Sequence, residues 1–181
     1  GVVLKPALAC TAHLLVAQLG GAPPSTEVTQ LFAWLLEFTL HANPKVRARA
    51  QTASATVLES HRSLSPAAAR FVQQRLGSLQ ARDVQSALFL LNFVKQVFAA
   101  FNAQAASTVL SSLFRLFDLR HAILTRSALD LLTAVTAEGT SDPLPAATLT
   151  AIVDQLLQLA GNGDAPDLSS PDAKPSAAGS L

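Results

Sequence analysis

The sequence contains a single cysteine and no methionine. Its one cysteine, Cys10, excludes an internal disulfide, and as a small apolar residue in an apolar run Cys10 is expected to be buried. A fold without disulfides fits a reducing compartment. Methionine is absent, at position 1 as well, which is typical of a fragment or a processed chain. Only 14% of the residues are charged, whereas 50% are hydrophobic, a balance expected of stacked amphipathic helices.

Residues that could hold a metal ion or carry out catalysis are few and scattered. The glycine pair Gly20-Gly21 lacks the following Lys-Ser/Thr of a phosphate-binding loop, and no nucleophile-elbow motif occurs. No second cysteine is available to complete a metal site, and four separate stretches carry the histidines His13, His41, His61 and His121. We therefore predict a protein that is not an enzyme and that uses no cofactor, metal ion or small-molecule substrate.

Long apolar runs are also missing. The longest candidate, from Ala87 to Phe101, is interrupted by Asn92, Lys95 and Gln96 and is shorter than the roughly 20 residues that a membrane helix needs. Residues 1–19 lack the pattern of a signal peptide, because Lys5-Pro6 breaks the apolar stretch. We expect no membrane partner.

Helical periodicity dominates the rest of the chain, and no segment alternates like a strand. The class predicted is all-α, with about eight helices. We expect them over about residues 5–19, 26–39, 44–60, 66–77, 84–101, 103–117, 120–136 and 146–160.

Helix starts carry clear signals. Asn43 followed by Pro44 is typical of an N-cap and a first helical residue, because the asparagine oxygen can accept from free N–H groups and the proline has none to leave unpaired. Ser65 and Pro66 repeat this pattern. Further N-caps are predicted at Ser25 or Thr26, Asp83 and Asn102.

The turns recur at a regular spacing. The helices expected near 44, 83 and 120 start 39 and 37 residues apart, close to the period of roughly 40–47 residues of HEAT-type units. An irregular bundle is the alternative, but the repeated spacing, short turns and similar helix lengths favour a HEAT/armadillo-like α-solenoid of antiparallel hairpins. Its predicted core includes Leu31, Leu35, Val57, Phe71, Leu90, Leu91, Val94, Leu113, Leu116 and Leu131.

The composition changes after Ala160, where Pro, Gly, Ser and Asp replace the periodic apolar residues. This predicts one solenoid segment over residues 1–160, expected to be part of a larger repeat protein, and a disordered linker or tail over residues 161–181.

The net charge is only +1, but basic and acidic residues are distributed unevenly along the chain. There are seven bases and one acid between His41 and Arg82, whereas there are six acids and one base from Glu138 onward. A basic stretch on a solenoid edge can bind RNA phosphate or an acidic protein segment, and a solvated face is the alternative. For Arg47 a structural role is also expected, since in HEAT repeats the arginine after the valine often pairs with an acid of a neighbouring repeat. We predict that the contacts include Lys45, Arg49, Arg62, Arg70 and Arg75.

Several stretches resemble one HEAT-repeat family. The segment from Leu35 to Gln51, LLEFTLHANPKVRARAQ, resembles the Phe-Thr-x-His-x-x-Pro-Lys-Val-Arg-Lys segment of the eukaryotic ribosomal RNA processing protein twelve family. Similar helices follow in the same order at Ser65–Phe71, Ala87–Lys95 and Leu110–Thr125, so that the resemblance covers roughly Lys5 to Ala160.

This resemblance implies an N-terminal part of a large factor of the nucleus and nucleolus. Such a factor binds pre-ribosomal particles through ribosomal RNA or assembly proteins and supports pre-rRNA processing and the maturation and export of ribosomal subunits. The alternative is a HEAT-repeat adaptor in transport or signalling, which would bind proteins without binding RNA.

Overall fold

The computed structural model describes residues 4–18, 24–138 and 143–161, and all regular structure within these ranges is helical. The three short 3-10 helices are η1 (Phe38–Leu40), η2 (Arg62–Leu64) and η3 (Phe98–Ala100). The α-helices are α1 (Leu4–Gln18), α2 (Thr26–Glu37), α3 (Pro44–Ser60), α4 (Ser65–Ser78), α5 (Val84–Val97), α6 (Ala103–Leu113), α7 (Arg115–Asp118), α8 (Ala122–Glu138) and α9 (Ala146–Gly161).

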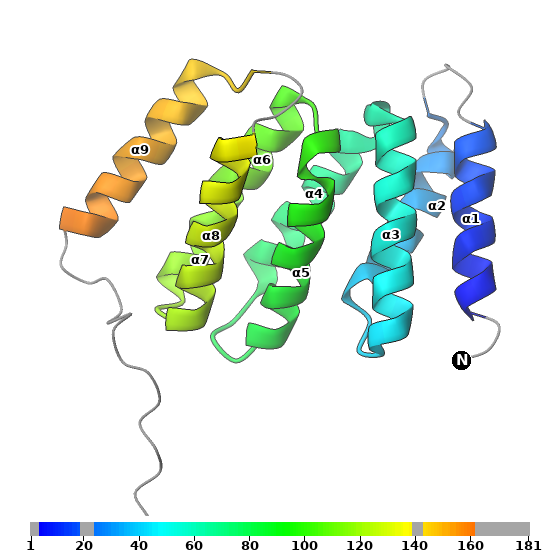
Figure 1. Cartoon of the computed structure of the whole chain (residues 1–181), viewed down its shortest axis with the longest axis horizontal. Coiled ribbons are helices and arrows are strands. Elements are labelled where there is room, and N and C mark those ends of the chain that lie inside the picture. Colours follow the sequence, from blue (N-terminus) through cyan, green and yellow to red (C-terminus); the bar gives the residue numbers. More distant parts are fainter. Residues whose placement is uncertain (1–3, 19–23, 139–142, 162–181) are drawn as a thin grey trace, which may run out of the picture.

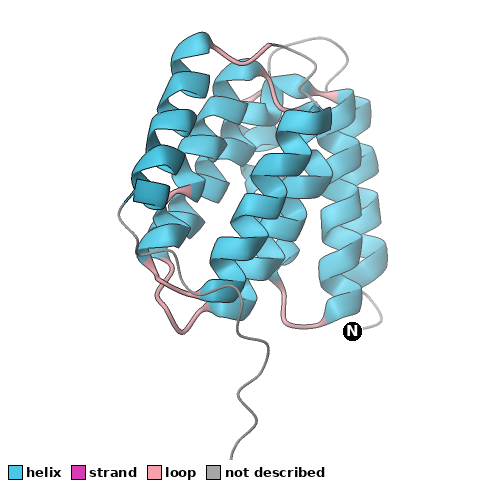
Figure 2. Cartoon of the chain, turned by 60° about the vertical axis from the view of Figure 1, so that its left-hand side comes forward, coloured by secondary structure: helices cyan, strands magenta, loops and turns pink. Residues whose placement is uncertain are grey.

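These helices stack as antiparallel hairpins in two layers (Figure 1). A front layer, nearest the viewer, consists of α1, α3, α5 and α8, each packed on the next. A rear layer consists of α2, α4, α6 and α7, and α9 packs on α6 at the end of the stack. The second view shows the same helices without a strand in the part that is described (Figure 2). The prediction of an all-α solenoid is confirmed.

Three of the predicted N-caps are confirmed by their hydrogen bonds. The Asn43 Oδ1 accepts from the backbone N–H of Lys45 at 3.0 Å and of Val46 at 3.4 Å. Asn102 caps α6 in the same way, and the Ser25 hydroxyl accepts from the third residue of α2. A hydrogen bond with Ser25 and one from the backbone lower the pKa of the neighbouring Glu27 carboxyl.

The predicted cap at Ser65 was wrong, whereas Asp83 occupies the predicted N-cap position of α5 without the side-chain hydrogen bond of a cap. Because η2 leads directly into α4, Ser65 already has helical angles, and its hydroxyl donates instead to the buried carbonyl of Ala100 at 3.1 Å. The Asp83 carboxylate accepts from the backbone N–H of Gln80 at 3.0 Å, within the turn before α5, and makes no cap hydrogen bond.

Several predicted helices have different bounds. Those predicted over 26–39 and 84–101 end as α-helices at Glu37 and Val97 and continue as η1 and η3, and two others differ further. The sixth is interrupted at Phe114, two residues after the Ser112 hydroxyl donates to the carbonyl of Thr108, a bond that competes with the helical ladder. The seventh starts at Ala122 rather than at residue 120 or 121, because Arg120 has a φ of 49° and cannot continue a right-handed helix.

The core matches the predicted apolar positions with two exceptions. Nine of the ten predicted core residues are buried, but Leu31 is 37% exposed. It lies beside the buried stripe of α2, which is formed by Phe32, Leu35 and Leu36. The expected burial of Cys10 was also wrong, since its side chain is exposed.

Buried polar side chains connect neighbouring hairpins. The Gln51 amide donates to the carbonyl of Thr39 at 3.1 Å and to that of Phe89 at 3.3 Å, and so α3 is joined to both η1 and α5. A bond of 3.0 Å joins the His61 Nε2 to the carbonyl of Val16 on α1. These contacts hold neighbouring helices of the front layer in one stacking register, because the buried Gln51 amide must find its hydrogen-bond partners there.

Some predictions fall on residues that the structure does not describe. These are the helix end at Gly20-Gly21, part of the loop at 139–145, and the tail from residue 162 onward.

The cap at Asn43 provides a first test of this fold. We expect Asn43→Ala to lower the free energy of unfolding by about 0.5–2 kcal/mol, because two N–H groups of α3 lose their acceptor. Urea denaturation followed by circular dichroism measures the change. An unchanged stability combined with loss of partner binding would instead make Asn43 a contact residue.

Candidate nucleic-acid interface

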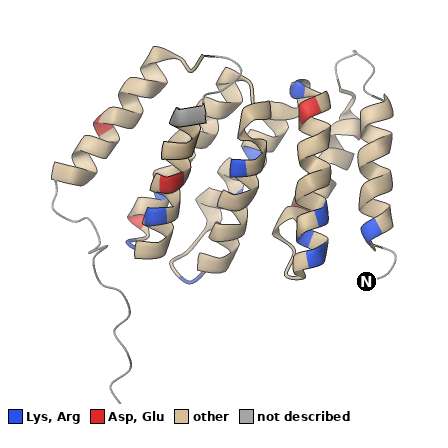
Figure 3. Ribbon diagram, viewed as in Figure 1, with Lys and Arg blue, Asp and Glu red and all other residues tan. Residues whose placement is uncertain are grey.

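The two layers differ in charge. The front-layer helices carry six lysines and arginines against three acids, whereas the rear-layer helices carry three bases against three acids. Figure 3 shows that lysine and arginine positions gather on the ribbon at the lower ends of α1 and α3. Positive charge is therefore concentrated on one face of the solenoid and toward one end of it.

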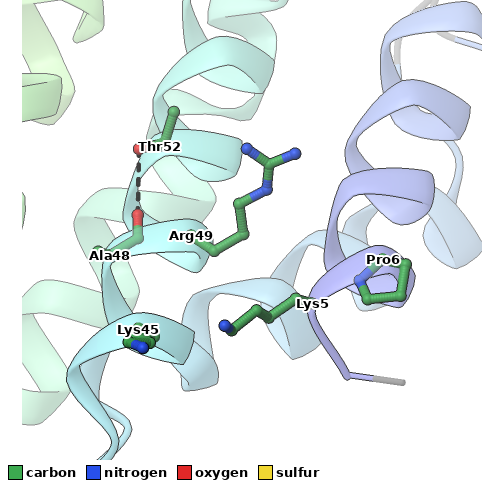
Figure 4. Close-up of a pocket in the computed structure, with 6 residues that line it drawn as sticks. All are labelled: Lys5, Pro6, Lys45, Ala48, Arg49 and Thr52. Carbon is green, nitrogen blue, oxygen red and sulfur yellow. Dashed lines mark hydrogen bonds between the residues drawn. The ribbon is translucent and has the colours of Figure 1, made fainter. Parts of the chain in front are cut away.

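Three of these cations meet in a groove between α1 and α3, which we call the α1/α3 groove. The groove forms a shallow cavity of about 560 Å³, lined by Lys5, Pro6, Lys45, Ala48, Arg49 and Thr52, without an acidic side chain among them. In Figure 4, Lys5 extends from α1 toward α3, and Arg49 extends from α3 into the space between them. All three basic side chains are exposed, so a ligand can reach them.

The local sequence explains this convergence. Lys45, Arg49 and Thr52 are four and then three residues apart, which places them on one face of α3. The helices α1 and α3 run in the same direction, so their N-terminal ends lie at the same end of the layer (Figure 1). Each N-terminus adds partial positive charge there. The groove therefore offers an anion three side-chain charges and two favourable helix dipoles.

The groove continues along the same pair of helices. A second cavity of about 200 Å³ lies next to it and shares Arg49 and Thr52. Its remaining lining includes His13 and Thr56 and contains no acid. An extended anion could thus follow the seam between α1 and α3.

Not all of the predicted contact residues join this groove. Arg62 begins η2, two residues after the end of α3, and the length of that helix separates it from Lys45 by about 25 Å. Arg70 lies on α4 in the rear layer, where its Nε donates to the carbonyl of Pro66. Arg75 on the same helix forms an ion pair with Glu37.

Arg47 has a structural role, which was the alternative expected for it. Its guanidinium donates to the carbonyls of His41 at 2.8 Å and Ala42 at 3.3 Å. The same group lies 3.5 Å from the centre of the Phe89 ring on α5, a cation–π contact between hairpins. The partners of Arg47 are thus an aromatic ring and two carbonyls, and not the acid that was expected.

Lys5 was not among the predicted contacts, although the sequence carries a signal for it. It is the second residue of α1, as Lys45 is the second residue of α3, and the two are 40 residues apart. This separation equals the spacing between the starts of α3 and α5. Extending the repeat register to the first hairpin would have placed both lysines together.

Two other classes of site are not found in the described ranges. No cluster of three His, Cys, Asp or Glu side chains that could hold a metal ion occurs there. None of the helices in those ranges is long and apolar enough to cross a membrane.

Comparisons with known proteins agree with the repeat architecture. A family model described as "RRP12-like, N-terminal HEAT repeats" matches residues 2–143. An RRP12-like protein from Gallus gallus is 27% identical over 138 residues, which cover 70% of this chain. The match spans only 11% of that relative's length. The chain belongs to the RRP12-like family and corresponds to its N-terminal HEAT repeats.

Proposed function

We propose that this chain is a non-catalytic scaffold of ribosome assembly, which acts in the nucleolus on pre-ribosomal particles. In this proposal the helical repeats hold ribosomal RNA through the α1/α3 groove and so support pre-rRNA processing and the maturation and export of ribosomal subunits. Membership of the RRP12-like family supports the setting. The RNA contact rests on the sequence and geometry of this chain.

The proposed RNA contact rests on one observation. Lys5, Lys45 and Arg49 converge from two helices on a groove whose lining has no acid. Phosphate groups favour such a site because each cation that pairs with a phosphate releases a condensed counterion. Arg49 can also donate two parallel hydrogen bonds to one phosphate.

A protein-binding adaptor is the second candidate. It is favoured by Leu149, Val153 and Leu157 on α9, which are between 43% and 64% exposed. They recur every four residues and so form one apolar stripe. An adaptor that used this stripe would bind its partner without dependence on the cations of the α1/α3 groove.

Neutralising the groove tests the proposal. We expect the variant Lys45→Ala/Arg49→Ala to bind structured ribosomal RNA more weakly and with a salt dependence shallower by about 2, because two phosphate contacts are lost. Fluorescence anisotropy across a salt series measures both quantities. The matched control is Arg70→Ala/Arg75→Ala, which removes the same charge from the rear layer.

The control decides how the result is interpreted. Loss of affinity in the groove variant alone, at unchanged helicity, supports the proposal. Equal affinity and salt dependence for the wild type and the groove variant would reduce the groove to a solvated surface. Exclusion of the fluorescently tagged chain from nucleoli in cells would count against the proposed location.

A further inference from the structure

Basic side chains continue across the front layer beyond the α1/α3 groove. Lys95 on α5 and Arg126 on α8 are both exposed. A second groove, of about 410 Å³, lies between these helices and is lined by Lys95 together with the polar residues Asn92, Ser127 and Asp130. Cations therefore occur on all four front-layer helices (Figure 3).

The spacing of these helices sets the length of the basic surface. Packed helices lie about 8–10 Å apart, so three steps from α1 to α8 cover about 24–30 Å. A single small anion would use one groove only. Cations distributed over this length suit a polyanion whose charges repeat along a rigid backbone.

The front layer offers no exposed phenylalanine, tyrosine or tryptophan ring in its described residues, and one imidazole, that of His13 on α1, is exposed. Its four helices contain two phenylalanines and neither tyrosine nor tryptophan, and Phe93 is fully buried. Phe89 is half-buried and lies beneath the Arg47 guanidinium. The exposed Trp34 belongs to α2 in the rear layer. Proteins that hold single strands stack successive bases on several exposed aromatic rings, whereas the described residues of this face offer only the His13 imidazole.

We infer that the front layer docks the sugar–phosphate backbone of double-helical RNA along a track from Lys5 to Arg126. This inference rests on the proposed function and names its substrate class. A duplex keeps its bases stacked inside and presents phosphates and 2′-hydroxyls, which are read by cations and polar groups. Such a surface recognises shape and charge and is indifferent to sequence.

Of the three acids on the front-layer helices, Asp130 is the one that lines a groove on this track, and it provides a sharp test. Asp130 is four residues after Arg126 on α8 and lines the same groove as Lys95. A carboxylate there repels phosphate, so its removal strengthens the interaction with duplex RNA. Asp154 on α9 lies outside the front layer and is the matched control.

The experiment compares two RNA probes on the 181-residue chain. One is a duplex long enough to span the track, and the other is an oligouridine with the same number of phosphates. We expect tighter binding to the duplex. The variant Lys95→Ala/Arg126→Ala should bind the duplex with a salt dependence shallower by about 2. Asp130→Asn should bind it more tightly, whereas Asp154→Asn should match the wild type.

The outcomes separate this inference from the proposed function. If Lys45→Ala/Arg49→Ala weakens RNA binding while Lys95→Ala/Arg126→Ala and Asp130→Asn have no effect, RNA binding at the α1/α3 groove is supported and the track is refuted. Preference for oligouridine also refutes the track and leaves RNA binding intact. Tight binding of polyglutamate, combined with no binding of either RNA probe, would overturn both the proposed function and this inference.

Discussion

Replacing Leu35 with alanine is expected to lower the free energy of unfolding by about 2–5 kcal/mol. Leu35 is fully buried on α2, a helix that packs against α1, α3 and α4. The substitution removes apolar contacts and leaves a cavity that the surrounding helices fill only in part. Urea denaturation followed by far-ultraviolet circular dichroism measures the loss.

Leu31 provides a matched control, since it is the same residue type one helical turn earlier on α2. Because Leu31 is 37% exposed, Leu31→Ala should cost only about 0.5–1 kcal/mol. Equal losses for the two variants would mean that the face of α2 assigned to the core is incorrect.

Arg47→Ala is expected to cost about 2–4 kcal/mol of stability, the second largest effect. The substitution removes a charged donor from the carbonyls of His41 and Ala42, which contributes about 1.5–3 kcal/mol. It also removes the cation–π contact with Phe89, which contributes about 0.5–2 kcal/mol. Denaturant unfolding provides the measurement.

Arg49→Ala should give the opposite pattern. Its side chain is exposed, and the expected change in stability is within about 0.5 kcal/mol, whereas RNA affinity should fall. The two variants, two residues apart on α3, would thus distinguish a structural role of Arg47 from a binding role of Arg49. A large stability loss for Arg49→Ala, or none for Arg47→Ala, would reverse these assignments.

The sequence predicted the helices well because their signals are local. Asn43 followed by Pro44 determines the start of α3 through a cap and a fixed φ, and neither depends on distant residues. Ser65 carried a similar local signal, but a neighbouring hairpin offered its hydroxyl the carbonyl of Ala100. Tertiary contact therefore overrode local chemistry at that position.

Burial was less predictable at the edges of helix faces. Leu31 is next to the buried stripe of α2, and Cys10 lies two residues from both Leu8 and Ala12, on the opposite side of α1. Apolar composition alone does not distinguish these positions from the core, since the direction of each face is set by stacking.

The candidate site depended most on the three-dimensional arrangement. A basic stretch in the sequence contains Lys45 and Arg49 as well as Arg62 and Arg70, but the hairpin separates them onto different ends and layers. Lys5, which is distant in sequence, joins the groove because α1 and α3 pack side by side. Only the repeat period connects Lys5 to this site before the fold is known.

Cross-linking tests the central claim, RNA binding on the front layer, without altering the protein. The wild-type chain is irradiated in complex with structured ribosomal RNA that contains a photoreactive nucleotide, and the attached peptides are identified by mass spectrometry. We predict attachment within α1 and α3, around Lys5, Lys45 and Arg49. Attachment confined to α2, α4 or α9 would contradict the claim.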